Sequence, residues 1–242
     1  MSQHLYFNIG EESRPLIEKL TKQNVKESLF SEQYKNALDS LSSYLKVSET
    51  WNKEGNEPFN NIFAFIGERG AGKTSCMLSV ANELTDKSEN SFLDSYEEVK
   101  NLAFHKLSLI DPSFFDEKHG IIAEILASLY HEYRVTEKPI NSLERTEILG
   151  KFADLQKDFN CLLASDAEKP HDDLEQLVGL SAAVNLRANF GELVTMFMKY
   201  IGKPEGKLIV MIDDIDLHTN QATVMVEQIR KYLVQPNVII LL

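Results

Sequence analysis

Three glycines stand within a short motif in the first third of the chain, at a spacing that can hold phosphate groups. Residues 67–74 read Gly-Glu-Arg-Gly-Ala-Gly-Lys-Thr and fit the pattern G-x-x-x-x-G-K-[ST]. Gly67, Gly70 and Gly72 would let the backbone turn back on itself and approach a phosphate without a side chain in the way. The N–H groups of such a loop point inward and form an anion site. The motif therefore predicts a site for a nucleoside triphosphate.

The side chains of this loop are expected to contribute unequally. Lys73 would bring a mobile positive charge to the β- and γ-phosphates, and the Thr74 hydroxyl would bind Mg²⁺. Glu68, Arg69 and Ala71 stand where only main-chain groups are needed. We therefore expect these three residues to bind the nucleotide through their backbone, with the side chains of Glu68 and Arg69 solvated.

The segments on both sides of the motif fit this interpretation. The apolar run Ile62–Ile66 before the motif is typical of a buried strand, and Ser75–Leu84 after it has the pattern of a helix. The positive end of that helix would strengthen the anion site. We include Ser75, the first residue of the predicted helix, among the nucleotide-binding candidates.

A second set of candidate residues lies near the other end of the chain, where acids follow another apolar run. Leu208–Ile212 is typical of a parallel strand buried on both faces, and open α/β sheets place ligands at the carboxyl ends of their strands. Asp213 is placed to hold Mg²⁺ through its hydration shell, and Asp214 to polarise an attacking water as a general base. The alternative is that these acids, Asp216 above all, end the strand and cap the next helix.

The last residues predict one further helix and one further strand. The helix covers Gln221–Leu233 and is stopped by Pro236, and the strand covers Val238–Leu242. Chain termini usually lie in loops or at the ends of strands, whereas this sequence stops inside an apolar run. We therefore expect this sequence to be the front part of a longer protein.

Composition places the chain among globular α/β proteins and weighs against some partners. Its 242 residues are 43% hydrophobic and 26% charged, which suits one sizeable core. The net charge of −12 argues against a broad basic surface for nucleic acid and leaves a narrow basic channel open. The first residues show no signal peptide and no stretch approaches about 18 apolar residues, so we expect no membrane segment. Cys76 and Cys161 are expected to be reduced, as in the cytoplasm.

The rest of the chain is expected to be mainly helical. We predict two parts, an N-terminal helical segment over residues 1–58 and an α/β core over 59–242 that carries a helical insertion at about 135–203. The predicted elements are a helical region over 11–50, a loop over 51–61, a polar surface connection over 88–98, a strand over 104–110, and helices over 121–133, 143–159 and 174–200. The long spacing between the strands is what indicates an insertion.

Together, these motifs resemble the additional-strand P-loop ATPases, a branch that includes the AAA+, STAND and KAP groups. The run Ile212-Asp213-Asp214-Ile215-Asp216 looks especially like KAP-type ATPases, in which I-D-D-L-D is common. The resemblance implies a three-layer α/β sandwich with a parallel sheet, binding of ATP and Mg²⁺, and an extra strand, Val238–Leu242, between the loop strand and the acidic strand. It also implies a polar sensor residue and an arginine finger, neither of which is identifiable in this sequence. In such ATPases a helix before the loop often forms a wall of the base pocket, and a plain packing helix is the alternative here.

Three functions are compatible with this sequence. The first is a Mg²⁺-dependent ATPase module that drives or gates a larger assembly, as a homo-oligomer or with an effector protein, in which Lys73, Asp213 and Asp214 are catalytic. ATP is preferred to GTP because the sequence has no N-K-x-D motif. The second is a nucleotide-gated scaffold with little turnover, and the third is a nucleic-acid remodelling motor. The resemblance also suggests a role in bacterial anti-phage defence, since several such systems use ATPases of this general kind.

Overall fold

The centre of the molecule is a four-stranded parallel sheet in the order β1-β4-β3-β2. The structure is a computed structural model that describes residues 15–54, 60–114, 120–136, 142–167, 173–215 and 219–242. The strands are β1 (Ile62–Phe63), β2 (Phe104–Lys106), β3 (Lys207–Met211) and β4 (Val238–Leu241). In the register, Ile209 of β3 pairs with Ile239 of β4, and Ile240 of β4 pairs with Ile62 of β1. The predicted strand order, with β4 between the loop strand and the acidic strand, is confirmed.

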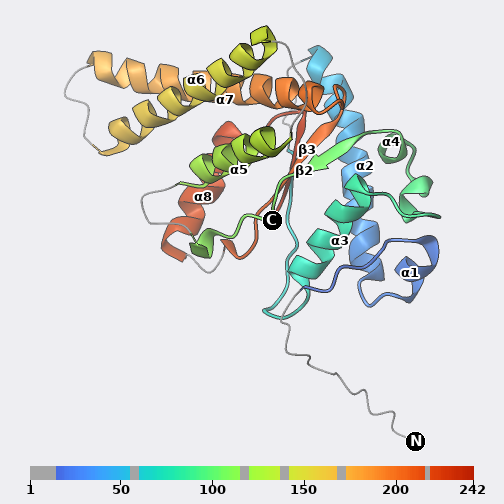
Figure 1. Ribbon diagram of the computed structural model, residues 1–242. Coiled ribbons are helices and arrows are strands. Elements are labelled where there is room, and N and C mark those ends of the chain that lie inside the picture. Colours follow the sequence, from blue (N-terminus) through green and yellow to red (C-terminus); the bar gives the residue numbers. More distant parts are fainter. Residues whose placement is uncertain (1–14, 55–59, 115–119, 137–141, 168–172, 216–218) are drawn as a thin grey trace, which may run out of the picture.

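Helices cover both faces of this sheet and give three layers (Figure 1). One face carries α1 (Lys22–Glu27), α2 (Ser31–Glu54), α3 (Lys73–Thr85), the 3₁₀ turn η1 (Phe92–Ser95) and α4 (Glu97–Lys100). The other carries α5 (Ile121–Val135), α6 (Ser142–Ala167), α7 (Asp173–Tyr200) and α8 (Thr219–Tyr232), and a second 3₁₀ turn, η2, covers Pro112–Phe114. The α/β fold class expected from the motifs is therefore confirmed.

Side chains of the two central strands alternate between two apolar cores. Leu208 and Val210 of β3 face the core beneath α5, α7 and α8, whereas Ile209 and Met211 face the core beneath α2 and α3. All four are almost completely buried. This two-sided burial explains why these strands are uninterrupted apolar runs rather than alternating patterns.

The N-terminal segment differs from the continuous helical region predicted over 11–50. Residues 15–20 are extended, and a turn at 28–30 separates α1 from α2, while residues 11–14 lie outside the described part. The extended backbone makes hydrogen bonds that a helix over these residues could not make. The N–H groups of Leu16, Glu18 and Leu20 donate to side chains spaced four residues apart on α3, namely Ser75 Oγ at 3.1 Å, Ser79 Oγ at 2.9 Å and Glu83 Oε2 at 3.1 Å.

Other elements also begin or end at residues different from those predicted. The loop predicted from Trp51 is wrong for its first residues, because α2 continues to Glu54. Both predicted outer strands are shorter than expected. Beyond β1, the N–H of Phe65 donates to the carbonyl of Leu242 at 2.7 Å. Beyond β2, the N–H of Leu107 donates to the carbonyl of Ile209 at 2.9 Å, and Ile110 forms a bridge with Ile212. The surface connection over 88–98 instead forms η1 and the start of α4, with residues 91 and 93 buried.

A long helical hairpin, α6 and α7, occupies most of the region predicted as an insertion. The two helices lie side by side and project beyond the sheet (Figure 1). From its middle onward, α7 packs against the core and buries Leu186, Phe190 and Phe197. Among the described residues, no helix is both long enough and apolar enough to cross a bilayer.

Candidate nucleotide site

The two sequence motifs meet at the carboxyl edge of the sheet. The glycine loop follows β1 and leads into α3, and the acidic residues follow β3. All strands are parallel, so their carboxyl ends lie at the same edge, with only β4 between the two motifs. Ligands of open α/β sheets bind at this edge.

The loop backbone has the conformation that only glycine adopts freely. Gly70 and Gly72 have φ values of +80° and +83°, in the left-handed region. Gly72 is the N-cap of α3, so the free N–H groups of the first helical turn begin directly after it. Glu68, Arg69, Gly70 and Ala71 are exposed, which leaves the loop accessible to a ligand.

Lys73 lies across the loop. Its Nζ donates to the carbonyl oxygen of Gly67 at 3.1 Å, spanning the loop from its last positions to its first. A Cβ on Gly67 would lie 3.2 Å from Cβ of Ala71, which shows how closely the loop folds on itself. The lysine charge is therefore held over the loop by one hydrogen bond to a main-chain oxygen, which a phosphate oxygen could replace.

A direct hydrogen bond joins the two motifs. The hydroxyl of Thr74 donates to Oδ2 of Asp213 at 2.6 Å, although the residues are 139 positions apart in sequence. Asp213 is anchored through its own N–H, which donates to the carbonyl of Ile110 at 2.9 Å. The predicted metal-binding pair is thus adjacent, with one carboxylate and one hydroxyl that suit a Mg²⁺ completed by phosphate oxygens and water.

Asp214 is placed beside this pair in an unusual conformation. Its φ is +49°, and its N–H donates to Oδ1 of Asp213 at 3.0 Å. A pocket of about 230 Å³ lies at this point, and its lining includes Gly67, Lys73, Asp213 and Asp214. A water molecule or a terminal phosphate in this pocket would lie near the carboxylates of Asp213 and Asp214 and near Lys73.

The remaining predicted residues are placed less directly. The side chain of Ser75 is turned away from the loop, because its Oγ accepts the N–H of Leu16. Asp216 lies outside the described residues. Within those residues, no group of three or more His, Cys, Asp or Glu could hold a metal ion alone, so a Mg²⁺ here would rely on the Thr74 and Asp213 pair together with its substrate.

A larger pocket also reaches the loop, and α2, the helix before the loop, forms one of its walls, which is the arrangement that the resemblance implied for a base pocket. It measures about 710 Å³, lies between α2 and the β1 edge, and reaches the loop at Ala71, Gly72 and Lys73. Gln33, Asn36 and Ala37 of α2 line it, together with Phe30 from the turn before that helix. Sequence periodicity indicated only the packed face of α2, and nothing in the local pattern connects residues near 30 with residues near 72.

A parallel sheet with a glycine-rich loop after one strand, an aspartate after another and a strand between them defines a P-loop NTPase fold. In a comparison with known protein families, residues 34–242 match the KAP family P-loop domain. Because this match covers most of the chain, the protein belongs to the KAP family of P-loop NTPases. A comparison with curated proteins gave no match.

Proposed function

We propose that this protein binds ATP with Mg²⁺ and hydrolyses it, as a module that drives or gates a larger assembly. The observation that carries the proposal is the 2.6 Å hydrogen bond between Thr74 and Asp213, because it brings the loop and the acidic strand together at one edge of the sheet. Family membership supports nucleotide binding, and the two motifs support the division of roles that follows.

The residues present fit the triphosphate and its metal. Loop N–H groups and Lys73 would hold the phosphates, while Thr74 and Asp213 would hold Mg²⁺. When bound, Mg²⁺ would neutralise charge on the β- and γ-phosphates. Lys73 would exchange the Gly67 carbonyl for a phosphate oxygen, and Thr74 would turn its hydroxyl lone pair to the metal. Asp213, already held by Ile110, would keep its position.

Asp214 is the proposed general base. Its partly buried side chain lies at the pocket next to Asp213, where it can orient a water and accept its proton. Its backbone is fixed by the bond to Asp213, so movement of the metal ligand would also move the base. The loop, metal pair and base would in this way respond together to the terminal phosphate.

The base of the nucleotide is proposed to extend into the larger pocket along α2. Gln33 and Asn36 in that wall offer amide donors and acceptors that suit a purine edge. ATP is preferred because the guanine motif N-K-x-D does not occur in the sequence. Both cysteines are free thiols, which suits a reducing compartment, and we propose a cytoplasmic location.

The test combines nucleotide binding with single-turnover hydrolysis. Lys73→Ala should abolish ATP binding at micromolar concentrations, and Asp213→Asn should remove the gain in affinity from Mg²⁺. Asp214→Asn should still bind ATP but hydrolyse it at least about 100-fold more slowly. Lys100→Ala, far from the loop and exposed, is the control and should behave as wild type. An unchanged hydrolysis rate in Lys73→Ala or Asp214→Asn would contradict the assignment.

We further propose that the γ-phosphate acts on a neighbouring protein, either another copy or an effector. Binding energy from this group can order surrounding elements, and hydrolysis can release them. Light scattering with ATP, with ADP and without nucleotide would detect a nucleotide-dependent change of oligomeric state. Tight ATP retention without phosphate release would favour the gated scaffold, and hydrolysis stimulated by DNA would favour the remodelling motor. No described residue supports an anti-phage role.

A further inference from the structure

Glu18 joins the extended N-terminal segment to the turn at 28–30 and α2 through its carboxylate, and to α3 through its backbone N–H. Glu18 Oε2 accepts the hydroxyl of Ser28 at 2.6 Å and the phenol of Tyr34 at 2.9 Å. The N–H of Glu18 itself donates to Ser79 on α3 at 2.9 Å. Burial raises the pKa of Tyr34, so this phenol keeps its proton and donates to the carboxylate.

The two donors to Glu18 are placed on either side of one aromatic residue. Phe30 lies in the turn between Ser28 and Tyr34, and its N–H donates to Ser28 Oγ at 3.0 Å. Its carbonyl accepts the N–H of Tyr34 at 2.9 Å, and the two rings pack edge to face with centroids 6.2 Å apart. The position of Phe30 is therefore fixed from both sides by residues that Glu18 holds.

The Phe30 ring presses against the last glycine of the loop. A Cβ added to Gly72 would lie 2.3 Å from Cζ of Phe30, so the ring occupies the space beside the Gly72 Cα. Gly72 has left-handed backbone angles and is the N-cap of α3, so its conformation sets the direction of the N–H groups that would bind phosphate. A loop with several glycines loses much conformational freedom when it binds a ligand, and a rigid neighbour reduces that loss.

We propose that Phe30 is a positioning residue that holds Gly72 and the loop in their anion-binding conformation, and that Glu18 holds Phe30 in place. This inference rests on the proposed triphosphate site. The extended segment around Glu18 thereby becomes an element that sets nucleotide affinity, although residues 15–20 line neither of the two pockets at the loop. A ring that acts through the loop affects every ligand with a polyphosphate, whatever base it carries.

The first experiment uses that distinction. Phe30→Ala and the milder Phe30→Leu are titrated with ATP and with inorganic tripolyphosphate by calorimetry, both with Mg²⁺. We expect Phe30→Ala to weaken both ligands by the same factor, about tenfold, and Phe30→Leu to weaken both less. A loss confined to ATP would mean that the ring stacks on the base and would overturn the proposal, as would unchanged affinity for both ligands.

The second experiment tests Glu18 with a matched pair of tyrosines. Tyr34→Phe removes the phenol bond to Glu18, and Tyr96→Phe removes a phenol bond of equal length, 2.9 Å, to Asp39 on the same helix α2. Both variants should lower the thermal midpoint of the free protein, but only Tyr34→Phe should weaken tripolyphosphate. Equal effects of the two variants on affinity would reduce Glu18 to a stabilising residue and overturn its proposed role.

A double-mutant cycle completes the test. If Glu18 acts through Phe30, then Glu18→Ala should weaken tripolyphosphate several-fold in the wild type and have no further effect in Phe30→Ala. Additive losses would contradict the proposed order of contacts. Wild-type protein that binds neither ATP nor tripolyphosphate would overturn the nucleotide site itself, and the inference with it, whereas normal wild-type binding with unaffected variants would overturn the inference alone.

Discussion

Asp214 combines a proposed catalytic role with a backbone conformation that few side chains tolerate. At φ +49°, its Cβ meets steric resistance that Asn and Asp bear best among residues with side chains. The strain is offset by the bond from its N–H to Asp213. Such conformations persist when the surroundings fix them and are concentrated at functional sites.

Substitutions at Asp214 should therefore separate strain from chemistry. Asp214→Asn keeps a side chain that accepts left-handed angles, so its free energy of unfolding should match the wild type. Asp214→Val places a β-branched side chain there and should lose about 1–2 kcal/mol. Denaturant unfolding measures both. Equal stability of the two variants would indicate that the backbone at this position is not strained in solution.

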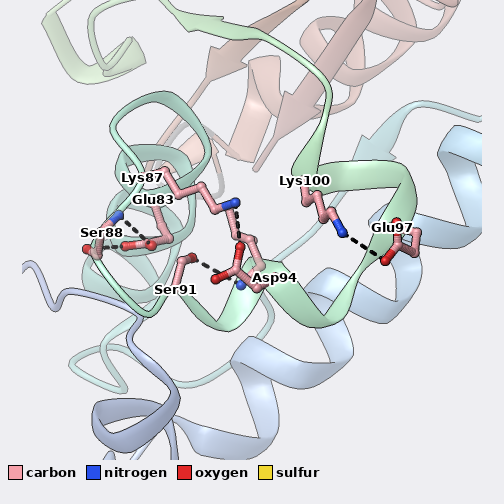
Figure 2. Close-up of polar contacts among 8 residues, drawn as sticks. Glu83, Lys87, Ser88, Ser91, Asp94, Glu97 and Lys100 are labelled. Atoms are coloured by element: carbon pink, nitrogen blue, oxygen red, sulfur yellow. Dashed lines mark hydrogen bonds and ion pairs between the residues drawn. The ribbon is translucent and has the colours of Figure 1, made fainter.

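At the scale of elements, α3 links the nucleotide loop to the N-terminal segment and to the turn that follows the helix. Glu83, which lies near the C-terminal end of α3 and is 2% exposed, makes both of these contacts. Its two oxygens accept the N–H of Leu20 and the N–H and hydroxyl of Ser88. Figure 2 shows the Ser88 contacts beside the ion pairs Lys87–Asp94 and Lys100–Glu97, which lie closer to solvent. The buried carboxylate thus takes the place of backbone carbonyls as the hydrogen-bond acceptor for these N–H groups.

Removing this carboxylate should be costly. Glu83→Ala leaves the buried N–H of Leu20 and the partly buried N–H of Ser88 without their acceptor, so we expect a loss of about 2–3 kcal/mol in the free energy of unfolding. Glu83→Gln keeps one acceptor oxygen and should lose less. The matched control, Lys100→Ala, breaks only an exposed pair and should leave the denaturation midpoint unchanged. A Glu83→Ala protein as stable as this control would contradict the assigned role.

In the α6–α7 hairpin, the helix α7 carries both buried and exposed apolar side chains. Phe190 of α7 is 1% exposed in the core above the sheet, whereas Val184 on the same helix is 70% exposed. Phe190→Ala should cost about 3–5 kcal/mol because it leaves a cavity, and Val184→Ala should change the stability little. Chemical denaturation of both variants would test whether α7 anchors the hairpin. A small effect at Phe190 would mean that the hairpin moves independently of the core.

At the scale of the molecule, the parts that sequence predicted are those encoded locally. The loop motif and the apolar runs of β3 and β4 each specify their structure within a few residues, and their meeting follows from parallel strand topology. The local sequence pattern could not predict the extended segment at 15–20, because its hydrogen-bond partners lie on α3, about sixty positions away. The contact of Phe30 with Gly72 has the same cause, since it depends on tertiary packing that no periodicity records.

The pH dependence of global stability should reveal one partly buried histidine where several elements meet. His105 on β2 packs against Phe197 of α7 with ring centroids 5.4 Å apart, and its Nε2 lies 3.7 Å from a carboxylate oxygen of Glu132 on α5. Burial lowers the pKa of His105 below its ordinary value of 6.5, against the attraction of Glu132 and with the help of the Lys203 charge.

The sign of the effect follows from proton binding. Above pH 6.5 the imidazole is neutral in both the folded and the unfolded chain, so its titration does not change the free energy of unfolding. As the pH falls through 6.5, the unfolded chain takes up a proton that the folded protein resists, so stability decreases on the acid side. His105→Phe keeps a ring against Phe197 and removes the titration. Its free energy of unfolding between pH 7.5 and 5.5 should therefore fall less steeply than that of the wild type. His131→Gln, at an exposed site, provides the comparison, and a slope equal to wild type in His105→Phe would show that the protonated imidazole is accommodated in the fold.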